Sequence, residues 1–98
     1  MGLKYTKEYS IIVDELTTAL ANFDNSHELF QMNSADWKLL SKQEQVEILN
    51  TLSDDIFYAL GSDDEYIIGN KKIKYNIENK SIDIFIDEQI VNIIYLLK

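Results

Sequence analysis

Residues 66–97 alternate between apolar and polar side chains, and this pattern restricts the fold more than any other feature of the chain. Residues 72–77 read Lys-Ile-Lys-Tyr-Asn-Ile, and residues 82–86 read Ile-Asp-Ile-Phe-Ile. A two-residue period is typical of β-strands that bury one face and expose the other. The rest of the chain must therefore supply a layer that covers the apolar face.

The central hairpin follows from where the alternation is interrupted. A two-residue turn at Asn79 and Lys80 would place Ile77 opposite Ile82, with the apolar side chains of both strands on one face. We predict this register because directly opposed residues must share a face of the sheet.

The same rule predicts the flanking strands. Residues 66–68 would fold back through a loop at 69–72, and residues 91–97 through a loop at 87–90, which places Val91 opposite Ile86. The result is an antiparallel meander of three or four strands over about residues 65–97.

The last segment has an alternative that stays open at this stage. Asp87 could cap a helix, because the apolar residues between 90 and 97 also follow helical spacing. We prefer a strand, since most of these residues are β-branched and the preceding alternation continues into them.

Two longer segments show the three- and four-residue spacing of amphipathic helices, over about residues 4–23 and 41–60. Ile11 lies off the apolar stripe of the first, so we expect it to be exposed or to contact a partner. Ser41 and Glu44 form a capping box at the start of the second, and Gly61 predicts its end.

Residues 25–40 are ambiguous, and we expect two short turns there with Trp37, Leu39 and Leu40 directed inward. No linker or repeat divides the chain, so residues 1–98 form one domain. The predicted fold class is α+β, with two main N-terminal helices packed on one face of a C-terminal three- to four-stranded antiparallel β-meander.

The composition excludes several classes of function. The chain contains seventeen Asp and Glu but only nine Lys and no Arg, so its formal charge is −8. This charge disfavours a nucleic-acid partner. There is no Cys, and no apolar run approaches a membrane span, so we expect no membrane partner and a cytoplasmic protein. The lack of Arg and Pro is typical of an AT-rich bacterial or phage genome.

No set of residues predicts an active site. His27 is the only histidine and lacks the companions that a general base or a metal ligand needs. We therefore assign no catalytic, cofactor-binding or metal-binding residue. A carboxylate-based metal-dependent enzyme working through Asp63, Asp64 or Glu65 stays as a second alternative, although these residues are typical of a polar connector.

Two predicted surface features are not required to form the hydrophobic core. Four carboxylates of the second helix fall within about 100° of its circumference, either as an ordinary solvated face or as an anionic stripe like those that DNA-mimicking inhibitors offer to basic proteins. The outer face of the sheet would also carry an apolar cluster, which usually marks a partner surface. Its members would be Ile67, Phe85, Ile90, Ile94 and Leu96.

We therefore expect a small, acidic, non-enzymatic protein-binding module that inhibits or neutralises a protein with a basic surface, of a phage or immunity type. The first alternative is a structural homo-oligomer or a subunit of a larger assembly. The predicted partner-binding residues are Glu44, Glu47, Asp54, Asp55, Phe85, Ile90, Ile94 and Leu96.

Overall fold

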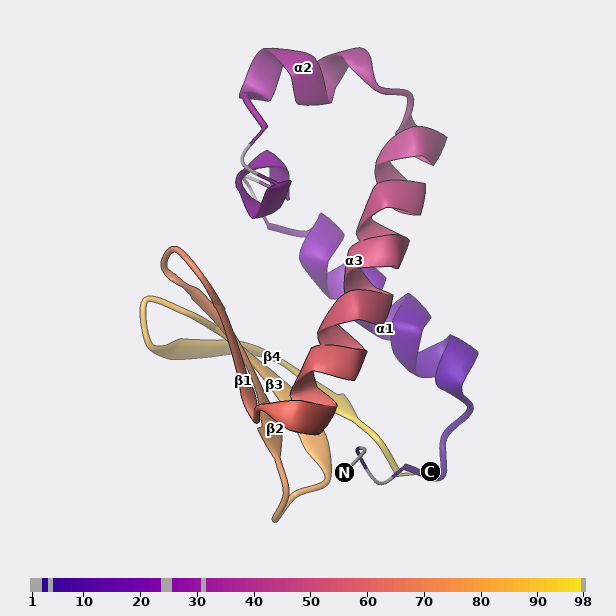
Figure 1. Ribbon diagram of the computed structural model, residues 1–98, viewed down its shortest axis with the longest axis vertical. Helices are drawn as coiled ribbons and strands as arrows, with labels where there is room; N and C mark the ends of the chain where they lie inside the picture. The colour runs from indigo at the N-terminus through magenta and orange to yellow at the C-terminus, as the bar shows by residue number, and fades with distance from the viewer. Residues whose placement is uncertain (1–2, 4, 24–25, 31, 98) are drawn as a thin grey trace.

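The computed structural model describes residues 3, 5–23, 26–30 and 32–97, and shows two long helices followed by a four-stranded antiparallel sheet. The helices lie on one side of the sheet (Figure 1). The predicted α+β class, with N-terminal helices and a C-terminal meander, is confirmed.

Helix α1 comprises Tyr9–Ala21, so it begins later than predicted. The predicted start at Lys4 lies outside the described residues, but residues 5–8 are not helical. The backbone N–H groups of Thr6 and Lys7 both donate to the carbonyl oxygen of Leu96, at 3.0 Å each. This segment therefore attaches to the C-terminal end of the sheet instead of extending the helix.

Helix α3 comprises Lys42–Ser62, and its predicted capping box is confirmed. The Ser41 hydroxyl accepts from the Glu44 N–H at 3.1 Å, and the Glu44 carboxylate accepts from the Ser41 N–H at 2.9 Å. The prediction that Gly61 ends the helix is wrong. The helix continues through Gly61, and its C-cap residue Asp63 is extended at φ −120°.

The segment between the long helices forms two short helical elements, η1 (Ser26–Phe30) and α2 (Ser34–Leu39). The ring of Phe30 stacks on Trp37 at 5.7 Å between centroids, and both pack against the core. Leu39 is 83% exposed, so the prediction that it points inward is wrong.

The sheet consists of β1 (Glu65–Ile68), β2 (Lys71–Asn76), β3 (Ser81–Ile86) and β4 (Gln89–Tyr95), in that order. The last segment is thus a strand, as preferred. β1 and β4 are the two edges of the sheet, so each leaves one side of its backbone unpaired within it.

The predicted pairings are wrong by two residues in the first two hairpins. Ile82 pairs with Tyr75, and Ile77 lies in a four-residue turn where it is exposed. That turn is held by the Asn76 side chain, which accepts from the Asn79 N–H at 3.1 Å, and by a positive φ of 52° at Lys80. A shift of two residues preserves the face of every side chain, so Ile73, Ile82 and Ile84 are buried as predicted, whereas Ile77 leaves the buried face for the turn.

The third hairpin changes the face of the last strand. Its turn is Asp87 and Glu88, both at positive φ, not the predicted loop at 87–90. Phe85 pairs with Ile90, whereas the neighbouring Ile84 pairs with Asn92, so one extra residue on β4 makes a β-bulge.

Because of the bulge, the side chains that follow it on β4 lie on the face opposite to the predicted one. Ile94 pairs with Ile82 and is buried with it in the core, and Leu96 is completely buried. The prediction that Ile94 and Leu96 lie on the outer face is therefore wrong. Val91, Ile93 and Tyr95, which were predicted to face the helices, are instead exposed.

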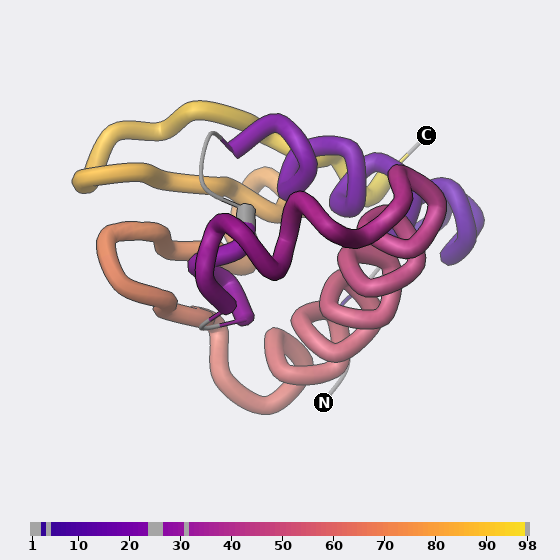
Figure 2. Tube along the Cα trace, turned by 90° about the horizontal axis from the view of Figure 1, so that it is seen from above, coloured from indigo at the N-terminus to yellow at the C-terminus, as the bar shows by residue number. Residues whose placement is uncertain are grey.

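The core lies between the sheet and the two long helices, with α1 beside β4 and α3 beside β1 (Figure 2). Thr17 and Ser53 form a buried polar contact between the helices, with 2.9 Å between their hydroxyl oxygens. The largest completely buried side chains on the two layers are Ile12, Leu16, Leu20, Ile56, Ile73, Ile82, Ile84 and Leu96.

Candidate protein-binding surface

The four carboxylates predicted as an anionic stripe differ in their surroundings. Glu47 and Asp55 are exposed on α3 and make no ion pair with any described residue. Asp54 is partly buried and accepts a hydrogen bond from the hydroxyl of Tyr9, which joins α3 to α1. The structure thus assigns Asp54 a contact that holds the two helices together.

Glu44 also has a role in folding. The backbone N–H and the hydroxyl of Ser41 hydrogen-bond to its carboxylate and hold the pKa of Glu44 below its ordinary value. The ionised carboxylate therefore stabilises the N-terminus of α3. Two of the four stripe residues thus have structural roles. Of the other two, Glu47 accepts a hydrogen bond from Gln43 on the same helix at 3.5 Å, and Asp55 is exposed.

The outer face of the sheet carries a different set of apolar residues from the predicted one. Phe85 is half-buried, and the Lys72 ammonium lies 4.9 Å from the centre of its ring. Asp83 is buried on the same face and accepts hydrogen bonds from Ser81 and Asn76, at 2.7 and 3.1 Å. With Ile94 and Leu96 in the core, the predicted members that stay on this face are Ile67, Phe85 and Ile90. Ile93 and Tyr95, which pair with Asp83 and Ser81, join them there.

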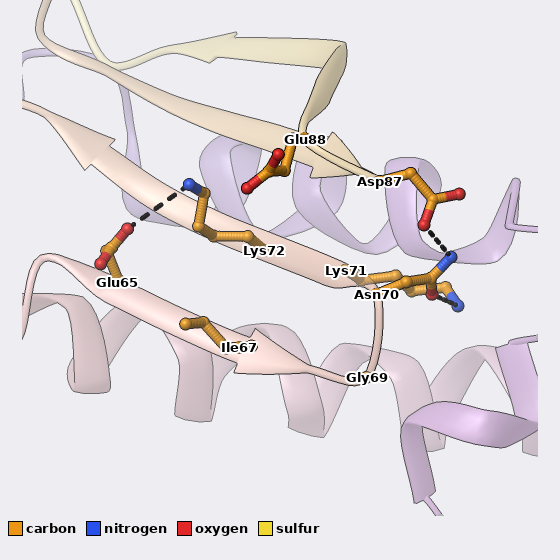
Figure 3. A pocket seen from close by; sticks show the side chains of 8 residues that line it. All are labelled: Glu65, Ile67, Gly69, Asn70, Lys71, Lys72, Asp87 and Glu88. Carbon is orange, nitrogen blue, oxygen red and sulfur yellow. Dashed lines mark hydrogen bonds and ion pairs between the residues drawn. The ribbon is translucent and has the colours of Figure 1, made fainter.

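A groove between the tips of the first and third hairpins is lined by charged side chains of both signs (Figure 3). Several of these side chains make contacts within the chain: Lys72 lies 3.6 Å from Glu65, and the Asn70 amide donates to Asp87 at 3.2 Å. The N–H of Asp87 also donates to the Asn70 carbonyl at 2.9 Å. These contacts fasten one hairpin tip to the other.

The apolar side chains that the chain leaves uncovered are concentrated on β4. This edge strand contains no charged residue. Ile90 is 48% exposed, Val91 52%, Ile93 37% and Tyr95 56%. Sequence reasoning identified only Ile90 among these four, because it placed the other three on the buried face.

The carboxylates at 63–65 do not converge. All three side chains are exposed, and Glu65 is the one that pairs with Lys72. In the described part of the chain, no group of three or more His, Asp or Glu side chains is arranged to hold a metal ion. His27 is half-buried in η1. Among the described helices, none combines the length and the apolar character that crossing a membrane would need.

Comparisons with known proteins give no further guide. The sequence matches no protein-family model, no curated protein and no solved structure. Function must therefore be argued from the surface itself.

Proposed function

We propose that this chain is a small non-enzymatic protein-binding module that inhibits or neutralises a partner with a basic surface. The observation that supports the proposal is the edge strand β4, which has seven residues, no charge and four exposed apolar side chains. An exposed, uncharged edge strand promotes pairing with another chain, and soluble proteins usually protect such an edge unless they use it.

The charge of the chain indicates the kind of partner. The formal net charge is −8, and the exposed carboxylates of Glu47 and Asp55 contribute to the negative field of the chain. A negative field steers a basic protein toward the surface and repels an acidic one. Binding would then be completed by apolar contacts at β4, and it would inhibit a partner whose working surface is thereby covered.

Affinity capture from a lysate of the source cell, with paired variants as bait, tests this proposal. Tyr95→Lys places a charge on β4, and Leu39→Lys makes the same change at an exposed apolar residue of α2. We expect a basic protein that is captured by the wild type and by Leu39→Lys but is lost with Tyr95→Lys. Loss in both variants, or in neither, would contradict the proposal.

The homo-oligomer alternative predicts a different result in the same samples. Light-scattering mass of the purified wild type would then give a defined dimer that Tyr95→Lys converts to a monomer. We propose a monomer before the partner binds, because two copies of a chain with charge −8 repel each other.

A further inference from the structure

A groove runs between α1 and the free edge of β4. One part, of about 360 Å³, is lined by Ile11, Asp14 and Thr18 of α1 and by Ile93 of β4. A second part, of about 250 Å³, is lined by Asn22 and Phe23 on one side and by Val91 on the other. Ala19 and Asn92 line both parts, so the two parts lie next to each other along the strand.

The backbone of β4 offers hydrogen-bonding groups on the groove side. The N–H of Leu96 donates to the Lys80 carbonyl at 2.9 Å, toward the preceding strand. Alternate residues of an antiparallel strand direct these groups to opposite sides, so Ile93 and Tyr95 direct theirs to the free edge.

The side chain of Asn92 occupies one of these edge positions. Its carbonyl oxygen accepts from the N–H of Ile93 at 2.8 Å. A neighbouring strand would supply a backbone carbonyl at the same place. The Asn92 amide therefore stands in for the acceptor of an absent strand, and it can rotate away when that strand arrives.

We infer that the partner contributes an extended segment that adds to β4 as a fifth strand and lies in this groove against α1. The inference rests on the proposed function. The seven residues of β4 extend over about 23 Å and the 13 residues of α1 over about 20 Å, so the groove accommodates about six residues of extended chain. Main-chain hydrogen bonds would supply affinity, and alternate side chains would supply specificity.

The wall of the groove selects a basic and apolar segment. Asp14 lines the groove and forms no ion pair with any described residue, while its neighbour Glu15 pairs with Lys7 at 2.9 Å. Ile11 is exposed on the helix side at the same end, and Ile93, which pairs with Asp83, is exposed on the outer face of the sheet. A Lys or Arg on the helix side of the added strand would reach Asp14 and lay its aliphatic stem over Ile11, and the alternate side chains would cover Ile93 on the opposite face.

The same carboxylates disfavour a second copy of this chain as the occupant. Two β4 strands joined about a two-fold axis perpendicular to the sheet would place both α1 helices on one side of the joined sheet. Asp14 and Glu15 of each copy would then approach those of the other, and like charges brought together weaken association.

The test is a titration of the full isotope-labelled chain with a hexapeptide of alternating lysine and valine, followed by amide chemical shifts. We expect shifts in residues 89–95 and along 11–18. A peptide of alternating glutamate and valine should bind at least about tenfold more weakly because its charge is wrong. A peptide of alternating lysine and proline should also bind at least about tenfold more weakly, because proline lacks the N–H that a strand donates.

Variants of the chain separate strand addition from general attraction. Asp14→Lys should lower the affinity about fivefold, whereas Asp55→Lys, the same change on α3, should have a much smaller effect. Ile93→Pro removes one N–H group from the free edge of β4 and should also lower the affinity for the peptide about fivefold. If that variant does not fold, Asn92→Ala serves instead, and it should raise the affinity because it frees the Ile93 N–H.

Several results would overturn the inference. These are no shift on β4 at millimolar peptide, shifts confined to Phe85 and Lys72, or equal effects of Asp14→Lys and Asp55→Lys. Concentration-dependent shifts on β4 without peptide would show a second copy in the groove. If capture from the lysate is lost with Tyr95→Lys but kept with Asp14→Lys and Ile93→Pro, the strand-addition inference fails while the proposed function stands.

Discussion

The two edges of the sheet are built in opposite ways. β1 has only four residues, carries Glu65 and follows two further carboxylates at 63–64. β4 has seven residues and no charge. Short length and charge are the usual means by which proteins keep an edge strand from pairing with other chains. The chain protects β1 and leaves β4 open, which is why we assign β4 the binding role.

The largest expected effect tests the bulge that gives β4 its orientation. Ile94 is buried, whereas its neighbour Ile93 is exposed. We expect Ile94→Ala to lower the free energy of unfolding by about 3 kcal/mol and Ile93→Ala by less than about 1 kcal/mol, because only the first leaves a cavity. Chemical denaturation of both variants measures the difference. Equal or reversed effects would mean that the alternation continues through β4 without a bulge.

A second experiment compares the edges directly through binding. Ile67 and Tyr95 are both exposed apolar residues, one on each edge strand. Changing Tyr95 to Lys should weaken capture of the partner about tenfold, and Ile67→Lys should leave it nearly unchanged, since a buried charge at an apolar contact is costly. A stronger effect of Ile67→Lys would transfer the binding role to β1 or to the outer face.

A third experiment separates folding from binding. Ser41→Ala removes the hydroxyl that caps α3, the helix that packs beside β1. It should lower the free energy of unfolding by about 1 kcal/mol. Because α1 and not α3 lines the groove at β4, binding at a temperature where the variant is folded should be unchanged. A parallel loss of affinity would indicate that α3 takes part in the contact.

The smallest expected effect concerns pH. The pKa of Glu44 is lowered in the folded state, so its ionised carboxylate contributes stability above its unfolded pKa, and this contribution is lost as pH falls through the lower folded value. Wild type should therefore be more stable than Glu44→Gln at pH 7, and this difference in stability should disappear at acidic pH. Thermal unfolding of both proteins at a series of pH values measures this difference. A difference that does not change with pH would contradict the account.

Local patterns in the sequence predict much of this fold. The capping box at Ser41 and Glu44 depends on residues three apart, so it can be read without tertiary knowledge. The faces of β2 and β3 follow from alternation alone, and they stay correct although the pairing is shifted by two residues.

The candidate site was harder to predict because it depends on a single extra residue in β4. A bulge has no strong sequence signal here, and it moves every later side chain of the strand to the opposite face. Asp87 and Glu88 adopt positive φ without the glycine or asparagine that usually marks a two-residue turn, so the preceding loop was also misplaced. Ile94 and Leu96 were therefore predicted on the surface, and Val91, Ile93 and Tyr95 in the core.

Amide hydrogen exchange of the captured complex, compared with the free chain, tests the central claim most directly. If β4 is the working edge, the partner should slow exchange over 89–95 and leave 65–68 unchanged, since added strands protect the N–H groups that they pair. Protection confined to 65–68, or to the exposed side of α3 around Glu47 and Asp55, would contradict the assignment of the open edge as the binding surface.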